Sequence, residues 1–196
     1  MPGAASYSER VLPVAVRLPA SINDVGEFLA DVTALEAAGA AALWIDDTGL
    51  DPWVLLGAMA AVTHRVRLGC LVNSSAAWSE EILTTLQKLS RGRTLIGVSS
   101  SGQAATLFTA GPNQEASTGS IIEVEPRELL GEARDTRLEA WVAIEVPPDR
   151  ATWSEKLSAY EAAGATGVIV SWNERVLDLL RNPEPDDRSD LLISTG

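Results

Sequence analysis

Short apolar segments alternate along the chain with segments of helical periodicity. The apolar segments are rich in β-branched residues and read almost continuously hydrophobic, which is typical of parallel strands covered on both faces. Strands that alternate with helices indicate parallel β-α-β units. The predicted strands cover residues 11–18, 41–46, 67–73, 94–100, 120–125, 139–146 and 166–172.

The first two predicted helices have recognisable boundaries. Ser21 and Asp24 have the spacing of a capping box, and the apolar periodicity that follows ends at Gly39, where a C-terminal glycine is expected. Asp51 precedes Pro52, which places a capping carboxylate before a proline at the first helical position. We therefore predict helices that begin after Ser21 and after Asp51.

Three further helices follow the same rules. The third is expected to bury Ile82, Leu83, Leu86 and Leu89 and to stop at Gly92. Thr152 with Glu155 predicts a second capping box, and Asn173 predicts the cap of the last helix. Residues 35–45 and 160–170 form a weak internal repeat, LEAAGAAALWI and YEAAGATGVIV, of the order helix end, glycine, strand. This repeat supports the architecture and carries no information on chemistry.

The order of elements favours a β/α barrel over an open sheet, because residues 17–20 (RLPA) stand where a dinucleotide fold would have a glycine-rich turn. We predict one domain over residues 1–196, a trimmed TIM-like α/β barrel of seven to eight mostly parallel strands. Either one unit is lost, or residues 190–195 return as a final strand. A long mobile loop is expected at residues 103–119, and a tail or strand at residues 183–196.

Three stretches of the sequence resemble the bacterial luciferase-like flavin- and deazaflavin-dependent oxidoreductases. They are residues 34–47 (ALEAAGAAALWIDD), 51–69 (DPWVLLGAMAAVTHRVRLG) and 86–102 (LQKLSRGRTLIGVSSSG). The resemblance implies a β/α barrel that binds FMN or deazaflavin and oxidises a small organic substrate, as the family's monooxygenases do. In the flavin enzymes of this kind the ring carries the electrons, and the protein supplies orientation and hydrogen-bond donors.

Two departures from the family pattern motivate an alternative. Thr48 stands where members of the family usually have a histidine, and residues 125–127 (EPR) stand where small residues and glycine usually hold a cofactor phosphate. A carboxylate repels a phosphate, and a proline lacks the N–H that a phosphate would use. The alternative is a cofactor-free, inactive relative that serves as a structural or partner-binding subunit; these departures and the short chain motivate it, and the oxidoreductase remains the first hypothesis.

In a β/α barrel the site lies where strands end and the following loops begin. This rule selects, by position alone, Arg17, Asp46, Asp47, Asn73, Ser74, Ser99, Ser100, Ser101, Gly102, Glu125, Arg127, Glu145, Ser171 and Trp172. Asp46 and Asp47 as a proton-sharing pair are disfavoured, because consecutive strand residues point to opposite faces. A solvated strand end with one capping carboxylate is the simpler interpretation. The residues expected to bind the cofactor are Asp47, Asn73, Ser99, Ser100, Ser101, Gly102 and Trp172. For the three serines the structural alternative is a hydrogen-bonded turn.

Metal and nucleophile chemistry find no support in the sequence. His64 and Cys70 are the single histidine and the single cysteine, so no zinc motif exists. Cys70 falls in a predicted buried strand, where thiols are usually inert. No catalytic residue is assigned.

The composition of the chain disfavours some classes of binding partner. The net charge of −12 disfavours nucleic acid and anionic lipid surfaces. The longest apolar stretch, residues 52–62, is too short to cross a bilayer, and the single cysteine is compatible with a reducing cytoplasm, where we expect the protein. Trp53, Trp78 and Trp153 lie near predicted helix starts. They serve either as packing staples or as a patch for a homodimer contact.

Overall fold

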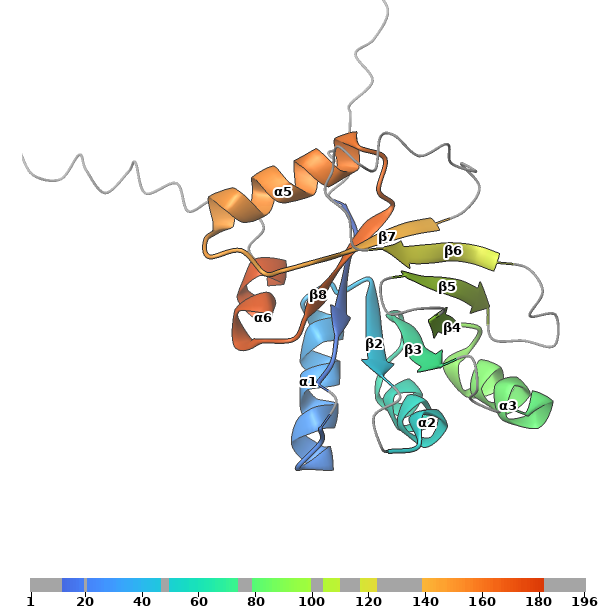
Figure 1. Cartoon of the computed structure of the whole chain (residues 1–196). Helices are drawn as coiled ribbons and strands as arrows, with labels where there is room; N and C mark the ends of the chain where they lie inside the picture. Colours follow the sequence, from blue (N-terminus) through green and yellow to red (C-terminus); the bar gives the residue numbers. More distant parts are fainter. Residues whose placement is uncertain are drawn as a thin grey trace, which may run out of the picture.

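The computed structural model describes residues 12–19, 21–46, 50–73, 79–99, 104–109, 117–122 and 139–181. Eight described strands close into a barrel in chain order, and helices lie outside it (Figure 1). The strands are β1 (Val14–Arg17), β2 (Ala42–Asp46), β3 (Arg67–Asn73), β4 (Thr94–Ser99), β5 (Ala104–Thr109), β6 (Ser117–Ile122), β7 (Glu139–Ile144) and β8 (Gly167–Ser171). The described helices are α1 (Val25–Ala37), α2 (Pro52–Val62), α3 (Glu80–Ser90), α5 (Arg150–Ala162) and α6 (Glu174–Arg181).

The barrel is mostly parallel, as the sequence predicts. Strands β1 to β4 pair parallel in sequence order, β6 to β8 do the same, and β8 closes on β1. Strand β5 runs antiparallel to both β4 and β6. Only four residues separate β4 from β5, which is too few for the crossover that parallel neighbours need, so the two strands pair antiparallel.

The expected loop at residues 103–119 is wrong, since it contains β5 and the start of β6. Its Gly, Ala, Ser and Thr content suggested a loop, but Ala105 and Leu107 alternate with Thr106 and are buried inside the barrel. Strand β5 also supplies the eighth strand of the closed barrel. The segment at 183–196 lies outside the described residues.

The caps of α2 and α6 are confirmed. Asp51 accepts hydrogen bonds from the amides of Trp53 and Val54, and Asn173 accepts one from Arg175. Two other caps are corrected, because an aspartate lies at the first extended position before each helix. Asp24 rather than Ser21 caps α1 through the Glu27 amide, 2.9 Å away.

Aspartate also replaces the cap expected at the start of α5. Asp149 accepts from both the amide and the hydroxyl of Thr152. These two hydrogen bonds lower the pKa of Asp149. In α3, Leu83 and Leu86 are buried as expected, but Ile82 and Leu89 are exposed.

The internal repeat is a repeated helix end. Gly39 and Gly164 both have positive φ, 96° and 86°. The backbone amide that follows each glycine donates a hydrogen bond to a carbonyl in the last turn of the helix. Ala40 donates to the Leu35 carbonyl, and Ala165 donates to the Tyr160 carbonyl. A positive φ favours glycine at both positions.

The barrel interior is filled by large side chains that face glycines. Trp44 of β2 is paired in register with Gly69 of β3, and Trp141 of β7 with Gly167 of β8. A Cβ at either glycine would lie 2.3 Å from the facing indole. Leu71 and Gly97 repeat the arrangement between β3 and β4. Each close approach is therefore specified by a large residue on one strand and a glycine on the next.

The amino-terminal end of the interior is closed by an ion pair. Arg67 Nη1 of β3 reaches Glu139 Oε2 of β7 across the barrel, at 2.8 Å. The Trp141 indole nitrogen donates to the same oxygen at 2.8 Å. A second, larger core lies between the strands and the helices and includes Cys70 and Trp153. Within the described residues, no helix is long and apolar enough to cross a membrane.

Candidate functional site

The carboxyl-terminal mouth of the barrel carries a lumen-side ion pair. Arg17 ends β1 and Asp46 ends β2, each two residues after an inward-facing core residue, Ala15 or Trp44. Because strand side chains alternate between faces, both side chains belong to the lumen side. Arg17 Nε lies 2.9 and 3.0 Å from the two Asp46 carboxylate oxygens, and Nη2 lies 2.9 Å from Oδ2. This fork geometry fixes the guanidinium plane at the mouth.

The pair remains accessible from outside. The Arg17 side chain is 42% exposed and the Asp46 side chain 21% exposed. Ser171, the last residue of β8, is paired in register with Arg17 and is exposed. The next amide, that of Trp172, donates to the Arg17 carbonyl at 2.8 Å. Arg17, Asp46 and Ser171 thus form a polar group on three adjacent strands, which we call the mouth cluster.

A buried donor lies on the same face of β2 as the mouth cluster. Trp44 is fully buried two residues before Asp46, and its indole nitrogen has no hydrogen-bond acceptor. Such orphaned donors are uncommon in protein interiors and often accompany functional sites. Together these groups make the mouth rich in donors above an apolar interior.

The predicted cofactor-binding residues are placed only in part. Asn73 and Ser99 end the adjacent strands β3 and β4 and are paired in register, so the fold brings their backbones together. Asp47, Ser100, Ser101 and Gly102 lie outside the described residues. The indole of Trp172 packs against the core between strands and helices. A binding role for each of these residues stays a prediction.

The Arg17–Asp46 pair was missed as a unit by sequence reasoning. Both residues were recognisable as polar strand ends, but 29 positions separate them. Only the parallel pairing of β1 with β2 brings them together. The signal that could have found them is a charge of each sign at the same end of two consecutive apolar strands.

The described part of the chain shows neither an accessible cysteine nor a cluster of metal-binding side chains. Cys70 is fully buried in the outer core. No group of three or more histidine, cysteine, aspartate or glutamate side chains lies together within the described ranges. His64 is exposed after α2, where its amide donates to Glu36.

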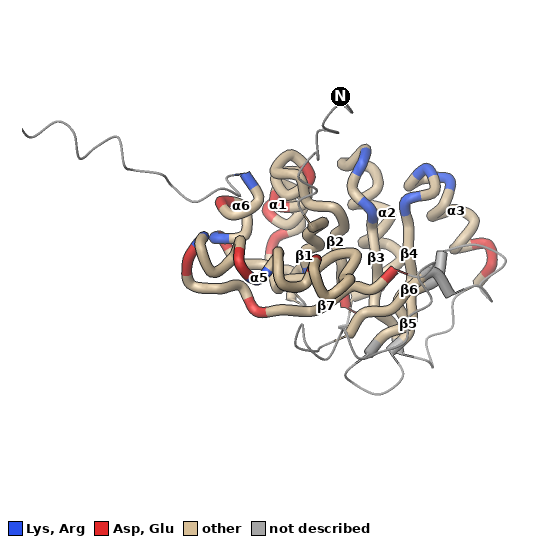
Figure 2. Tube along the Cα trace, turned by 90° about the horizontal axis from the view of Figure 1, so that it is seen from above, with Lys and Arg blue, Asp and Glu red and all other residues tan. Residues whose placement is uncertain are grey.

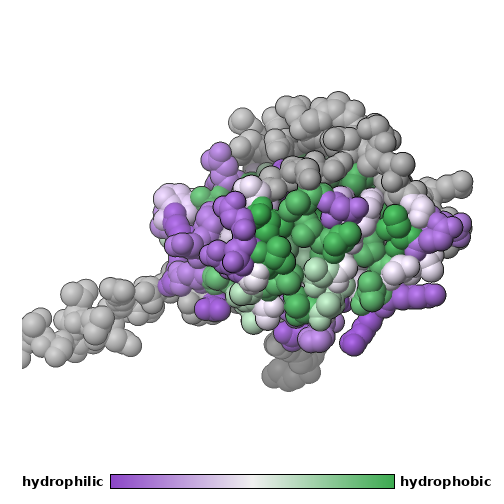
Figure 3. All heavy atoms as spheres, turned by 90° about the horizontal axis from the view of Figure 1, so that it is seen from below, coloured by the Kyte–Doolittle hydropathy of each residue, from purple (hydrophilic) through white to green (hydrophobic). Residues whose placement is uncertain are grey.

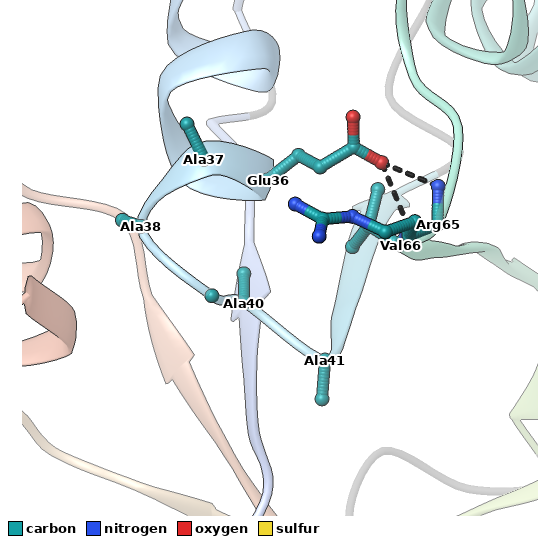
Figure 4. A pocket seen from close by; sticks show the side chains of 8 residues that line it. Glu36, Ala37, Ala38, Ala40, Ala41, Arg65 and Val66 are labelled. Atoms are coloured by element: carbon teal, nitrogen blue, oxygen red, sulfur yellow. Dashed lines mark hydrogen bonds between the residues drawn. The ribbon is translucent and has the colours of Figure 1, made fainter.

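A hollow of about 450 Å³ lies at the opposite end of the barrel, where α1 ends and β2 begins (Figure 4). Glu36 borders it and accepts the amides of His64, Arg65 and Val66 at 2.8, 2.6 and 2.9 Å. Partial burial disfavours the charged carboxylate, but the three amides and Arg93 outweigh burial, so the pKa of Glu36 is lowered. The carboxylate thus holds the α2–β3 connection to α1.

Arg93 binds the same connection from its carbonyl side. Its guanidinium donates to the carbonyls of Val66 at 2.6 Å and Thr63 at 3.0 Å, and to the Thr63 hydroxyl at 3.1 Å. Glu36 satisfies amides and Arg93 satisfies carbonyls, so this connection is fixed from both sides. At the amino-terminal end of a β/α barrel such contacts serve stability rather than catalysis. We therefore assign the hollow to the scaffold and the mouth cluster to the candidate site.

Comparison with protein families matches residues 9–123, more than half of the chain, to luciferase-like monooxygenases. The chain belongs to this family. The matched segment runs from before β1 to the end of β6 and contains Arg17, Asp46, Glu36 and Arg93. The contacts described above give a physical reason for two of the motifs in this luciferase-like chain. Glu36, the glutamate of LEAAG, and Arg93, the second arginine of SRGR, both form hydrogen bonds with the backbone of the α2–β3 connection.

Other comparisons add little to this luciferase-like assignment. No curated protein matches the sequence. A crystal structure of tryptophan synthase from M. tuberculosis, in an aminoacrylate- and BRD0059-bound form, is similar over 82% of this chain and 82% of that chain. Its sequence identity is 16% and its TM-score 0.44.

Proposed function

We propose that the protein is an oxidoreductase that binds FMN or deazaflavin at the carboxyl-terminal mouth of the barrel and acts on a small organic substrate. The family match supports an oxidoreductase type of fold. The observation that carries the proposal is the accessible Arg17–Asp46 pair at the end where β/α barrels place their sites. A cytoplasmic location belongs to the same proposal and rests on the sequence.

The donor chemistry of the mouth cluster fits such a cofactor. The contacts of Arg17 with Asp46 use Nε and Nη2, which leaves the two N–H groups of Nη1 for a carbonyl or phosphate oxygen. Asp46 fixes the guanidinium plane, so little conformational entropy is lost when a ligand binds. The Ser171 hydroxyl offers a further donor beside it.

Because the barrel interior is filled by side chains, the ring of the cofactor would have to bind above it. Trp44, Leu107 and Trp141 occupy the lumen below the mouth. The cofactor would therefore be bound by strand ends and the loops that follow them. When bound, a flavin or deazaflavin ring supplies the electron transfer, and Arg17 and Ser171 would orient it.

A second candidate function has one observation in its favour. The same filled lumen, with Leu107 fully buried in it, suits a cofactor-free relative that acts as a partner-binding subunit. The two candidates differ in what the purified protein binds. The cofactor-free candidate predicts no spectral change with either cofactor.

The test is a titration of the purified full-length chain with FMN and with deazaflavin, followed by absorbance and fluorescence. We expect saturable binding of one of them. Arg17→Ala should weaken it about tenfold or more, the equivalent of about 1.4 kcal/mol for lost charge-assisted hydrogen bonds. The cofactor affinity of Arg17→Lys should lie between those of Arg17→Ala and the unchanged chain, because lysine keeps the positive charge but lacks the forked guanidinium.

Arg150→Ala is the matched control. It removes another arginine that forms a two-oxygen contact with an aspartate, Asp178, between α5 and α6. Its cofactor affinity should equal that of the unchanged chain. Absence of binding at high micromolar cofactor would refute the oxidoreductase proposal and leave the cofactor-free candidate.

A further inference from the structure

Three exposed basic side chains gather at the amino-terminal end of the barrel. Arg65 lies in the α2–β3 connection, Lys88 lies in the last turn of α3, and Arg91 directly follows α3. We call these three residues the basic rim. Figure 2, the view from above, shows Lys and Arg gathered at the ends of α2 and α3 and at the starts of β3 and β4. None of the ion pairs formed among the described residues includes a side chain of the basic rim.

The acidic residues next to the basic rim have other partners. Glu36 accepts three backbone amides and lies near the charge of Arg93. Glu139 binds Arg67 and the indole nitrogen of Trp141. Arg93 and Arg67 therefore balance these two carboxylates, and the positive charge of the basic rim is not compensated by the described part of the chain.

The helix dipole explains only part of this charge. A cation in the last turn of a helix is stabilised by the negative end of the dipole, which accounts for Lys88. The dipole acts within the last turn, whereas Arg65 lies three residues beyond Val62, the last residue of α2. The Arg65 side chain instead extends over the hollow between α1 and β2 (Figure 4).

This hollow has room for a small apolar group beside Arg65. Residues 37–41, AAGAA, form most of its lining, and its volume is about 450 Å³. The scaffold contacts at the hollow use the Glu36 carboxylate and do not use the Arg65 guanidinium. A carboxylate held by this guanidinium could therefore be accompanied by a short apolar side chain packed on the alanines.

The opposite side of the molecule has a different character. Figure 3, the view from below, shows apolar side chains in the middle of that face. Exposed large apolar residues lie in or just before the first turns of α1, α2 and α3, namely Val25, Leu50, Val54 and Ile82. A ligand that is held by its negative charge is therefore expected at the basic rim rather than on this side.

The chain itself contains a segment of matching chemistry. Residues 182–196, NPEPDDRSDLLISTG, follow α6 in the sequence. Helix α6 leads from the carboxyl-terminal end of β8 back to the amino-terminal end of the barrel (Figure 1). The segment therefore starts at the same end as the basic rim. Its acidic residues are Glu184, Asp186, Asp187 and Asp190, against the single basic residue Arg188.

The segment is long enough to reach the basic rim. The helices follow one another around the barrel in the order α6, α1, α2 and α3, because β8, β1, β2 and β3 are neighbours. Adjacent helices lie about 10 Å apart, so the α2–β3 connection is about 20 Å from the end of α6 and the end of α3 is about 30 Å from it. An extended chain spans about 3.4 Å per residue. Asp187 can therefore reach Arg65, and Asp190 can reach Arg91.

The net charge favours an occupant from the same chain over a separate acidic partner. A separate polyanion is repelled by a molecule of net charge −12. Exposed ion pairs are also individually weak, so they hold a separate partner poorly. A tethered segment acts instead at an effective concentration in the millimolar range.

We propose that residues 182–196 dock on the basic rim of the same chain. Asp186 and Asp187 bind Arg65, Pro185 packs on the alanines of the hollow, and Asp190 binds the end of α3 at Lys88 and Arg91.

The first test is carbodiimide coupling in the full chain, which joins an amine to a carboxylate in direct contact. Lys88 and Lys156 are the two lysines of the chain, and Arg65→Lys adds an amine to the rim without changing the charge. Peptide mapping should show Lys88, and position 65 in the variant, joined to residues 186–190. Lys156 lies on α5 outside the rim and is the control, which should give no product with the segment.

A mixture of 15N-labelled and unlabelled chains separates coupling within a chain from coupling between chains. Absence of any product with residues 182–196 would overturn the proposal. Coupling of position 65 to Glu36 alone, coupling between chains only, or equal coupling at Lys156 would also overturn it.

The second test measures tryptic cleavage after Arg188, which a docked segment should slow. Arg65→Gln and Arg91→Asn should each speed this cleavage about two- to fivefold, as expected for loss of one exposed ion pair. Asparagine is chosen at position 91 because it tolerates the positive φ of 56° there. Lys156→Gln removes one positive charge elsewhere and should leave the rate unchanged.

Salt provides an independent readout of the same contacts. At about 0.5 M salt, screening should remove most of the difference between the unchanged chain and the double variant Arg65→Gln/Arg91→Asn. Circular dichroism should show unchanged folding, because both side chains are exposed. Equal cleavage rates in the unchanged chain and the double variant at low salt, or an equal increase in Lys156→Gln, would overturn the proposal.

Discussion

The hydrogen bonds of Glu36 lead to a specific prediction on stability. Its carboxylate accepts three backbone amides, from His64, Arg65 and Val66, at 2.6 to 3.1 Å. Because the carboxylate is only partly buried and the freed amides can bind water, each bond contributes about 1 kcal/mol. Glu36→Ala should therefore lower the free energy of unfolding by about 3 kcal/mol, and Glu36→Gln by about 1–2 kcal/mol, since the amide keeps an uncharged acceptor.

The internal repeat provides the control for this prediction. Glu161 occupies the position equivalent to Glu36 at the end of α5, but its exposed side chain forms none of the described hydrogen bonds. Urea unfolding monitored by tryptophan fluorescence would give both free energies. Glu161→Ala should change stability by less than about 0.5 kcal/mol. An equal loss at Glu36 and Glu161, or no loss at Glu36, would refute the reasoning.

The pH dependence gives the same prediction a second readout. The pKa of Glu36 is lower in the folded chain than its ordinary value. Its stabilisation is therefore present above the unfolded pKa, about 4.3, and is lost as the pH falls through the folded pKa. The stability gap between the unchanged chain and Glu36→Gln should be constant from pH 7 to about pH 5 and should narrow progressively as the pH falls below the unfolded pKa. A gap that does not change with pH would contradict the assignment.

Four substitutions test other parts of the account by thermal or urea unfolding. Gly167→Ala should lower the free energy of unfolding by about 1–3 kcal/mol or more, because the new Cβ would lie 2.3 Å from the Trp141 indole. Gly57→Ala should instead raise it by about 0.5–1 kcal/mol, because alanine favours the helical conformation of α2 more than glycine does. Equal effects of the two substitutions would contradict the pairing of Trp141 with Gly167. Arg93→Lys should cost about 1–2 kcal/mol, since lysine cannot reach the Val66 and Thr63 carbonyls together. Asn173→Ala should cost about 1 kcal/mol through loss of the α6 cap, and a neutral result would show that water replaces it.

Much of the fold could be predicted from the sequence, because periodicity and helix-end glycines act locally. Gly39 and Gly164 marked two helix ends correctly. Strand β5 was missed because its short, small residues look like a loop, and only burial of Ala105 and Leu107 inside the barrel reveals a strand. The pairing of large residues with glycines on the next strand also needs the register, which no single segment encodes.

The candidate site was predictable only as a region. The rule that sites follow parallel strands selected the end of the strands at which the mouth cluster lies, but the Arg17–Asp46 contact depends on the pairing of β1 with β2. In contrast, some of the residues that resemble the family contribute to the stability of the fold rather than to the candidate site. Glu36 and Arg93 lie in the resembling segments, yet both bind the backbone at the end of the barrel opposite the mouth cluster.

The most direct test of the central claim locates the bound cofactor with the indole N–H signals of the tryptophans. In a 15N-labelled chain titrated with FMN or deazaflavin, the account predicts that the Trp44 signal shifts, since Trp44 lies on the same face as Asp46 with an unpaired indole nitrogen. The Trp141 signal should stay in place, because its indole nitrogen is bound to Glu139 at the other end of the barrel. A shift of Trp141 without Trp44, or no shift at saturating cofactor, would contradict a site at the carboxyl-terminal mouth.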